Sequence, residues 1–380
     1  MNTPRSENGF RFDLREANGA LGDIGTLLPL IVGAIALVGL SSSQVLLGFG
    51  AFYVATGVIY RLPIPVQPMK AIAAMALVSE VTPASIAMSG MMIGGVLLFL
   101  GASGLIDRIA RLVPQSIMAG LQLGLGLSLG WIALGLMQDQ LWVGLVSLGI
   151  ALAALRFGTH AALLTLLSGV VLGLFVSQPG LPVLAAPADM WALATIKTHD
   201  LKTAISDLAI PQLALTLTNA VFLTALIAQD SFGNRAKQVT PLNLSLTSGA
   251  ANLLLAPLGA LPMCHGAGGV TAHYRFGART GGAPVMLGGA LVGLAVLPDQ
   301  VRQIALTAIP AATLGALLLI VSIELAFSRR LIDALPSCRP VIAITALGTF
   351  FANPLIGLIL GTLAEIFRKR IVAKQKQLFR

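Results

Sequence analysis

Long apolar stretches recur along almost the whole 380-residue chain, from about residue 20 to residue 366. Many of them reach the roughly 20 residues that an α-helix needs to cross a lipid bilayer. They lack the strict alternation of a membrane β-barrel strand, and 56% of all residues are hydrophobic while only 10% are charged. We therefore expect an all-α polytopic membrane protein whose backbone hydrogen bonds are satisfied within helices.

The apolar stretches predict about fourteen spans in two sets of seven. The first set lies near 20–40, 43–60, 67–79, 84–103, 114–136, 141–156 and 159–177, and its third member is short. The second set lies near 209–229, 240–257, 267–277, 281–298, 304–327, 340–352 and 354–367, and its third member is also short. The predicted units are therefore a first repeat at 20–177, a loop at 178–208 and a second repeat at 209–367, with polar segments 1–19 and 368–380 outside them.

The basic residues predict how the chain is oriented. With the N-terminus in the cytoplasm, all of the 24 lysines and arginines fall at cytoplasmic ends and loops except Lys70, Lys197, Lys202 and Arg302. This distribution follows the positive-inside rule, and the opposite orientation fails it. We expect both termini in the cytoplasm, the loop 178–208 outside and, for a bacterial source, residence in the inner membrane. Because the cations lie at the ends of spans, the net charge of +9 does not predict a nucleic-acid partner.

An odd number of spans per set predicts that the second set is inverted relative to the first, as in many secondary transporters. Matching motifs support the inversion. "GDIGT" at 22–26 precedes "PIPVQPMK" at 63–70, and "TLTNA" at 216–220 precedes "LPMCHGAGG" at 261–269 by a similar distance. Each pair combines a polar interruption of a long helix with a proline-marked irregular segment that leads into a short helix. We expect the two short half-helices to meet, N-terminus to N-terminus, near the middle of the membrane.

Two such helix ends favour an anion, because free N–H groups and the helix dipole make each N-terminus partly positive. Gly266, Gly268 and Gly269 are expected to adopt positive φ angles and to allow close approach, which forms an anion cradle. Lys70 lies in the first turn of the first short helix, where a buried cation is costly unless it is offset. Three roles are open for Lys70. Its ammonium contacts the ligand directly, or it pairs with Asp23 or attracts the anion at a distance, or its side chain extends to water at the membrane surface.

Asp23 is the most unusual acid, because it lies inside the first predicted span. It is a candidate proton carrier or a partner of Lys70, or else it lies at the mouth of a helix that starts later. Thr218 and Asn219 hold the equivalent place in the second set and offer neutral hydrogen bonds. His265 donates to a substrate oxygen or titrates, or it satisfies nearby carbonyl groups. The two cysteines, Cys264 and Cys338, predict no disulfide framework, metal site or catalytic dyad, so we expect no enzyme and no cofactor.

The runs "GDIGTLLPL", "PIPVQPMKAIAAMAL" and "LPMCHGAGGVTAHYRFGARTGG" resemble the molybdate transporter family of bacteria and plants, a relative of the SulP sulfate permeases. The resemblance covers nearly the whole apolar chain and implies the seven-plus-seven inverted repeat, with a core domain that moves against a gate domain. It implies a substrate site between the two short helices, flanked by Asp23 and Thr26. The binding residues that we expect are Gln67, Pro68, Met69, Lys70, Thr218, Asn219, His265, Gly266, Ala267 and Gly268.

The function predicted from this resemblance is secondary-active import of molybdate by alternating access, with proton coupling through Asp23 or His265 as a further hypothesis. The alternatives are transport of sulfate or another oxyanion by the same fold, and an anion channel. Expected partners are the oxyanion, membrane lipid and, by analogy with SulP relatives, a second copy in a homodimer. The segment after the last predicted span, 368–380, is short and basic, so we expect no STAS regulatory domain of the kind that sulfate permeases have.

Overall fold

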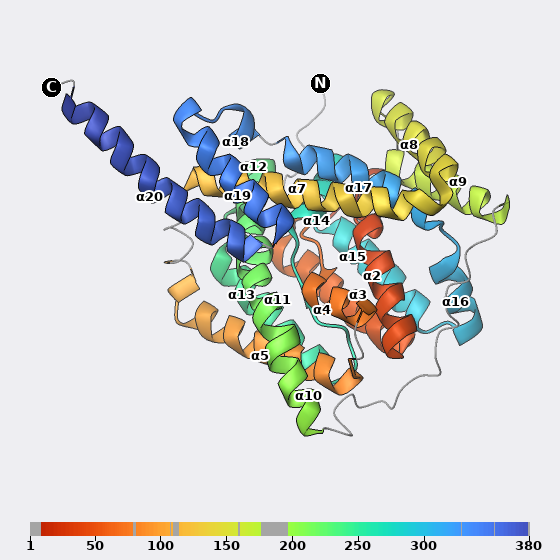
Figure 1. Cartoon of the computed structure of the whole chain (residues 1–380). Coiled ribbons are helices and arrows are strands. Elements are labelled where there is room, and N and C mark those ends of the chain that lie inside the picture. The colour runs from red at the N-terminus through yellow and green to blue at the C-terminus, as the bar shows by residue number, and fades with distance from the viewer. Residues whose placement is uncertain are drawn as a thin grey trace.

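The structure is a computed structural model that describes residues 9–78, 81–106, 108, 114–158, 160–175, 197–327, 329–352 and 354–378. Helices dominate it (Figure 1). The elements before residue 176 are α1 (Leu14–Leu21), α2 (Ile24–Val38), α3 (Ser42–Tyr60), β1 (Gln67–Pro68), α4 (Lys70–Val78), α5 (Pro83–Ala102), α7 (Gln115–Met137), α8 (Leu141–Arg156) and α9 (Ala161–Phe175).

The elements after residue 196 include two short π-helices, η2 (Ala204–Ala209) and η3 (Thr216–Leu223), within one long composite helix. The helices and the strand are α10 (Thr198–Thr203), α11 (Ile210–Leu215), α12 (Thr224–Phe232), α13 (Pro241–Leu255), β2 (Met263–Cys264), α14 (Ala267–Arg275), α15 (Gly282–Ala295), α16 (Asp299–Thr307), α17 (Ala311–Ala326), α18 (Arg329–Ile332), α19 (Arg339–Phe351) and α20 (Pro354–Leu378).

Most helices begin close to where their sequence predicts, because the start signals are strong. The side chains of Ser41, Thr82 and Thr240 each accept a hydrogen bond from the backbone N–H three residues later, at the starts of α3, α5 and α13. Proline follows Thr82 and Thr240 directly, in the first helical position where a missing N–H costs nothing.

Four predicted boundaries differ from the structure. The helix predicted at 209–229 begins earlier, because α10 and η2 already form residues 198–209, within the predicted loop 178–208. The first helical stretch begins at Leu14, not near residue 20, and breaks at Gly22 and Asp23 between α1 and α2. The predicted span 304–327 is two helices, α16 and α17, bent by 55°. Pro310 lies at this bend, where it disfavours a helical conformation for the residue before it. The last helix continues beyond residue 367 to Leu378.

Four helical stretches within the described residues are long and apolar enough to cross a membrane: Leu14–Ile35, Ser42–Tyr60, Pro83–Ala102 and Gln115–Arg156. The bent pair α16 and α17 would make a fifth. The other predicted spans form helices that are shorter or interrupted, so the number of fourteen spans stays a prediction. The helical membrane fold itself is as expected.

The packing of the helices is reciprocal between the two sets. Helix α3 packs against α15, and α13, the counterpart of α3 in the second set, packs against α5, the counterpart of α15. Paired glycines let the backbones approach closely at both contacts. Gly50 lies against Gly288 between α3 and α15, and Gly94 lies against Gly249 between α5 and α13. The same close contact is thus made twice, as expected of two related halves.

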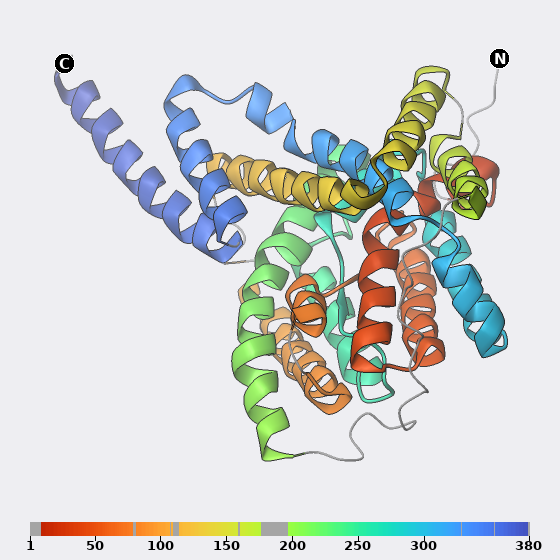
Figure 2. The same cartoon turned by 45° about the vertical axis from the view of Figure 1, so that its right-hand side comes forward.

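A second group of helices lies along one side of this body. Helices α7 and α17 pack together and run across the top of Figures 1 and 2, and α7 also packs against α19, which packs against α20. Helices α8 and α9 pack together beyond the opposite end of α7 (Figure 2). The division into a core and a gate stays a prediction.

Candidate functional site

The centre of the candidate site is a pair of crossed extended segments. Strands β1 and β2 pair antiparallel, with Gln67 opposite Cys264 and Pro68 opposite Met263. The Met69 N–H extends the pairing by donating to the Pro262 carbonyl at 2.9 Å. Because α4 begins two residues after β1 and α14 begins three residues after β2, the two short helices start beside each other.

Buried side chains satisfy the backbone groups of these extended segments. Asn252 of α13 accepts from the Met263 N–H at 2.9 Å and donates to the Met263 carbonyl at 2.6 Å. His273 places its Nδ1 3.0 Å from the Pro63 carbonyl oxygen. A buried peptide group without a partner is unfavourable, so these contacts hold the crossing in place.

His265 takes part in the same support. Its Nδ1 lies 2.9 Å from the Pro65 carbonyl oxygen, and its Nε2 lies 2.9 Å from the Thr247 hydroxyl. A carbonyl only accepts, so Nδ1 carries a proton and donates to Pro65. His265 lines the central cavity, but both of its ring nitrogens are in hydrogen bonds with the protein. Direct donation to a substrate requires one of these bonds to break.

Asp23 lies at the break between α1 and α2 and is fully buried. Its carboxylate accepts from the Gln67 amide at 2.5 Å and from the Tyr53 hydroxyl at 3.2 Å. It also lies against the start of α14, because a Cβ added to Gly269 would be 2.8 Å from the Asp23 Oδ2. Asp23 therefore joins the first helical stretch to both crossed segments.

A small cavity lies where these segments meet. Its volume is about 10 Å³, counted as the positions that the centre of a water molecule can take. This is room for about one water. Its walls are Gln67, Pro68, Lys70, Gln212, Leu215, Asn219, Cys264 and His265. Among the described residues, the Lys70 Nζ, the Gln67 Oε1 and the Asn219 Oδ1 are buried without a hydrogen-bond partner. Three unpartnered polar atoms around one cavity indicate a place for a polar ligand.

Within the part of the chain that the structure describes, no salt bridge reaches Lys70. Its ammonium is neither paired with Asp23 nor exposed to water. Of the three alternatives that the sequence left open for Lys70, the geometry favours a cation held for a ligand.

The cavity brings together five of the predicted binding residues: Gln67, Pro68, Lys70, Asn219 and His265. The other predicted residues lie around it. Met69 is buried next to Lys70, and Gly266, Ala267 and Gly268 form the start of α14. Thr26 is buried in the first turn of α2, and Thr218 is buried in η3.

Gln212, Leu215 and Cys264 line the cavity but were not predicted as binding residues. A signal for Gln212 was present, because it is a polar residue that stands seven positions before Asn219 in an apolar helix.

The expectation that the cradle glycines adopt positive φ is wrong. The described glycines with positive φ are Gly39, Gly104, Gly158, Gly233, Gly259 and Gly277. Gly266 has an extended φ of −138°. Close approach is the reason for glycine here: a Cβ on Gly266 would collide with the Gln67 amide, and a Cβ on Gly269 would lie 2.6 Å from the Pro65 Cβ.

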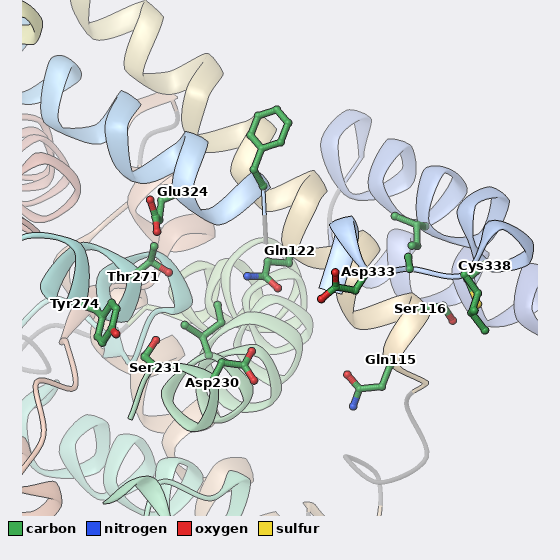
Figure 3. A pocket seen from close by; sticks show the side chains of 15 residues that line it. Gln115, Ser116, Gln122, Asp230, Ser231, Thr271, Tyr274, Glu324, Asp333 and Cys338 are labelled. Carbon is green, nitrogen blue, oxygen red and sulfur yellow. The ribbon is translucent and has the colours of Figure 1, made fainter. Parts of the chain in front are cut away.

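A second, larger cavity of about 950 Å³ borders α14 at Thr271 and Tyr274 (Figure 3). In Figure 3, Glu324, Thr271 and Tyr274 lie at one end, while Asp333 and Cys338 lie at the other. Thr271 is one turn after Ala267, to whose carbonyl its hydroxyl donates at 3.2 Å. We call this cavity the vestibule. Its walls are Gln115, Ser116, Gln122, Ile227, Asp230, Ser231, Thr271, Tyr274, Glu324, Phe327, Asp333, Ala334, Leu335, Cys338 and Ile342.

Solved structures with the same fold are membrane anion transporters. The transmembrane domain of a cyanobacterium bicarbonate transporter aligns with a TM-score of 0.56 and 16% identity, over 93% of this chain and 98% of that one. The murine Solute Carrier 26 family member A9 anion transporter in the inward-facing state aligns with a TM-score of 0.61 and 13% identity, over 96% of this chain and 69% of that one. At these identities the likeness shows the fold.

Sequence relatives are more specific. The chain is 31% identical to Molybdate transporter 2 of Arabidopsis thaliana, over 83% of this chain and 78% of the relative. It is 29% identical to Molybdate transporter 1 of the same plant, over 94% of this chain and 88% of the relative. Residues 15–129 and 204–325, which contain the crossed segments and both short helices, match the family described as molybdate transporter of MFS superfamily. The chain is a membrane anion transporter and belongs to the molybdate transporter family.

Proposed function

We propose that this protein imports molybdate as a secondary-active transporter that works by alternating access. One observation carries the choice of an oxyanion site: the buried Lys70 ammonium has no described partner and faces the cavity between the starts of α4 and α14. The molybdate-specific part of the proposal comes from the sequence relatives.

A tetrahedral dianion suits this arrangement. The first turns of α4 and α14 carry amide groups that have no acceptor within their own helices. Each helix end contributes about half a positive charge, and Lys70 adds a full one. A cation buried at membrane depth costs about 2.5–3.5 kcal/mol or more unless it is offset, and a bound dianion offsets it. The same groups would suit sulfate, so discrimination must come from the size of the opened cavity and from donor geometry.

In the proposed mechanism, one group of helices moves relative to the other. The body that contains α3, α5, α13 and α15 carries the site, and the group that contains α7, α17 and α19 is the gate. The repeats 20–177 and 209–367 each contribute to both. The vestibule lies between residues of the two groups, from Thr271 in α14 to Ile342 in α19. We propose that it is the inward-facing half of the transport path.

The proposal also includes three features of the cellular setting. Both termini are cytoplasmic, and a bacterial protein of this sequence resides in the inner membrane. Exposed apolar residues along α19 and α20, among them Leu347, Phe351 and Leu363, contact lipid or a second copy in a homodimer. Coupling to protons runs through Asp23, which is buried beside the site.

Equilibrium calorimetry on the detergent-purified protein tests the substrate. We expect molybdate to bind and to be displaced by tungstate but not by sulfate or chloride. Displacement by sulfate at equal concentration would contradict molybdate selectivity and would leave a general oxyanion transporter. If no oxyanion binds, the site as described is refuted and an anion channel becomes the better account.

A further inference from the structure

Gln212 lies between the cavity and the start of α4. It is 2% exposed and belongs to α11, just before the π-helix η3. Its side-chain oxygen accepts a hydrogen bond from the Ala71 N–H at 2.7 Å. Its amide nitrogen donates to the Thr216 hydroxyl at 3.0 Å. A neutral side chain from a helix about 140 residues away in sequence therefore covers a donor of the short helix.

The covered donor is one that an oxyanion would use. Ala71 is the second residue of α4, whose first-turn amides have no acceptor within the helix. Such a position favours an anion or a partly negative oxygen. The Gln212 oxygen is partly negative, and it occupies this position next to Lys70 in the wall of the cavity.

The size of the cavity shows that the site is closed as it stands. A volume of about 10 Å³ holds about one water, and a tetrahedral oxyanion is several times larger than a water molecule. Some of the wall must therefore move before the anion can enter. Pro68 and Cys264 belong to the paired strands, and His265 is held at both ring nitrogens. Gln212 is held in the structure by the side-chain contacts to Ala71 and Thr216, so a change of rotamer frees both the space and the donor.

We propose that Gln212 is a placeholder for the substrate. Its side-chain oxygen accepts from the Ala71 N–H while the site is empty, and it leaves this amide when an oxygen of the substrate takes its place. The inference rests on the proposed oxyanion site, and it adds a residue that sets affinity by competing with the ligand. The Ala71 N–H therefore keeps a hydrogen-bond partner when no substrate is bound, which lowers the free energy of the empty site.

Two substitutions separate a placeholder from a ligand. Gln212→Ala removes the competitor, so we expect molybdate to bind more tightly, by several-fold up to about tenfold, as loss of one competing hydrogen bond allows. Gln212→Glu places a carboxylate of the same shape on the same amide and close to Lys70, so we expect molybdate affinity to fall more than tenfold. A direct ligand predicts weaker binding in both variants.

The pH profile gives a readout that a purely structural role would not change. Protonation removes the charge of the introduced glutamate, so we expect the affinity of Gln212→Glu to recover toward the wild-type value as the pH is lowered. Gln212→Ala should keep its advantage over the wild type at each pH. Gln138, which is exposed in the short 3-10 helix Gln138–Gln140 before α8, provides matched control variants, Gln138→Ala and Gln138→Glu.

The experiment is calorimetry of the full-length purified protein with molybdate, tungstate and sulfate as probes, at two pH values, together with thermal melting of every variant. Tighter binding by Gln212→Ala with weaker, pH-dependent binding by Gln212→Glu supports the placeholder. Weaker binding by a folded Gln212→Ala overturns it and leaves the oxyanion site intact. Absence of binding to all three probes by the wild type overturns the proposed function, and the placeholder with it.

Discussion

At the scale of single residues, Lys70 has the clearest electrostatic role. Its ammonium is buried, and no described acid pairs with it. A cation in such a place is stabilised when an anion binds and destabilised when the site is empty. The proposed placeholder, Gln212, is neutral, so it covers a donor without neutralising Lys70.

Replacing Lys70 by alanine should therefore weaken oxyanion binding strongly. A hydrogen bond to a charged group contributes about 1.5–3 kcal/mol, so we expect a loss of about 10- to 100-fold in molybdate affinity by calorimetry. Expression and melting temperature should change little or improve, because an unpaired buried charge is removed. Lys237→Ala, at an exposed lysine, is the matched control. Wild-type affinity in Lys70→Ala would remove Lys70 from the site.

Asp23 is the residue that tests proton coupling. Asp23→Asn keeps an acceptor for the Tyr53 hydroxyl and removes the titrating carboxylate. We expect molybdate uptake into proteoliposomes to lose its dependence on an imposed pH gradient, while binding without a gradient persists. The measurement is initial uptake at several gradients in wild type and variant. An unchanged gradient dependence would exclude Asp23 as the proton carrier.

At the scale of elements, the crossing of β1 and β2 is the feature that creates the site. Two extended segments are buried inside the protein, which is tolerable only when their backbone groups are satisfied by protein. Pairing between the strands supplies part of this, and Asn252, His265 and His273 supply more. The prolines predicted the extended segments, and the histidines proved to support these segments.

Glycines at the start of α14 should differ in how well they tolerate a methyl group. A Cβ on Gly269 would press on Pro65 and Asp23, whereas a Cβ on Gly268 would meet only the end of the Leu129 side chain at 3.0 Å. We expect Gly269→Ala to lower the melting temperature and abolish uptake, since overpacking costs about 1–3 kcal/mol. Gly268→Ala should retain most of its binding.

Gly289→Ala serves as the control for these glycine variants, because nothing lies within 4 Å of an added Cβ there. Melting curves and molybdate binding of the three variants make the comparison. Wild-type stability and uptake in Gly269→Ala would show that the crossing is looser than the packing indicates.

At the scale of the whole molecule, the vestibule is the proposed inward-facing half of the transport path. The vestibule contains the carboxylates of Asp230, Glu324 and Asp333. Glu324 is paired with Arg275 at 3.5 Å. Acidic side chains lower the local concentration of an anion, so the vestibule suits passage of an anion better than its storage.

The two native cysteines can test this orientation. Cys338 is partly exposed in the vestibule, and Cys264 is 6% exposed beside the small cavity. We expect a charged, membrane-impermeant thiol reagent to label Cys338 only from the cytoplasmic face and to leave Cys264 unlabelled. Sided labelling of intact and inverted vesicles measures this, with Cys338→Ser as the control. Labelling from the opposite face would reverse the proposed topology.

The predictable parts of the fold and of the site are those that leave a signal in neighbouring residues of the sequence. Proline, glycine and capping residues marked the short helices, and polar residues in apolar runs marked Asp23, Lys70 and Asn219. The positive φ expected at Gly266, Gly268 and Gly269 was wrong. Glycine permits either a positive φ angle or the close approach of another group, and the sequence does not distinguish these two uses. Gln212 escaped because its contact with Ala71 joins two distant parts of the chain.

The sequence by itself determined that this chain is a helical membrane protein with two related halves. The length of the apolar runs, the placement of charges and the spacing of motifs can all be read directly along the chain. Only the tertiary structure decided which atoms face the cavity. The pairing of Gln67 with Cys264, the hydrogen bond from Gln67 to Asp23 and the Gln212 contact each join residues far apart in sequence. Such contacts depend on how whole helices pack, and the close approach of paired glycines sets that packing.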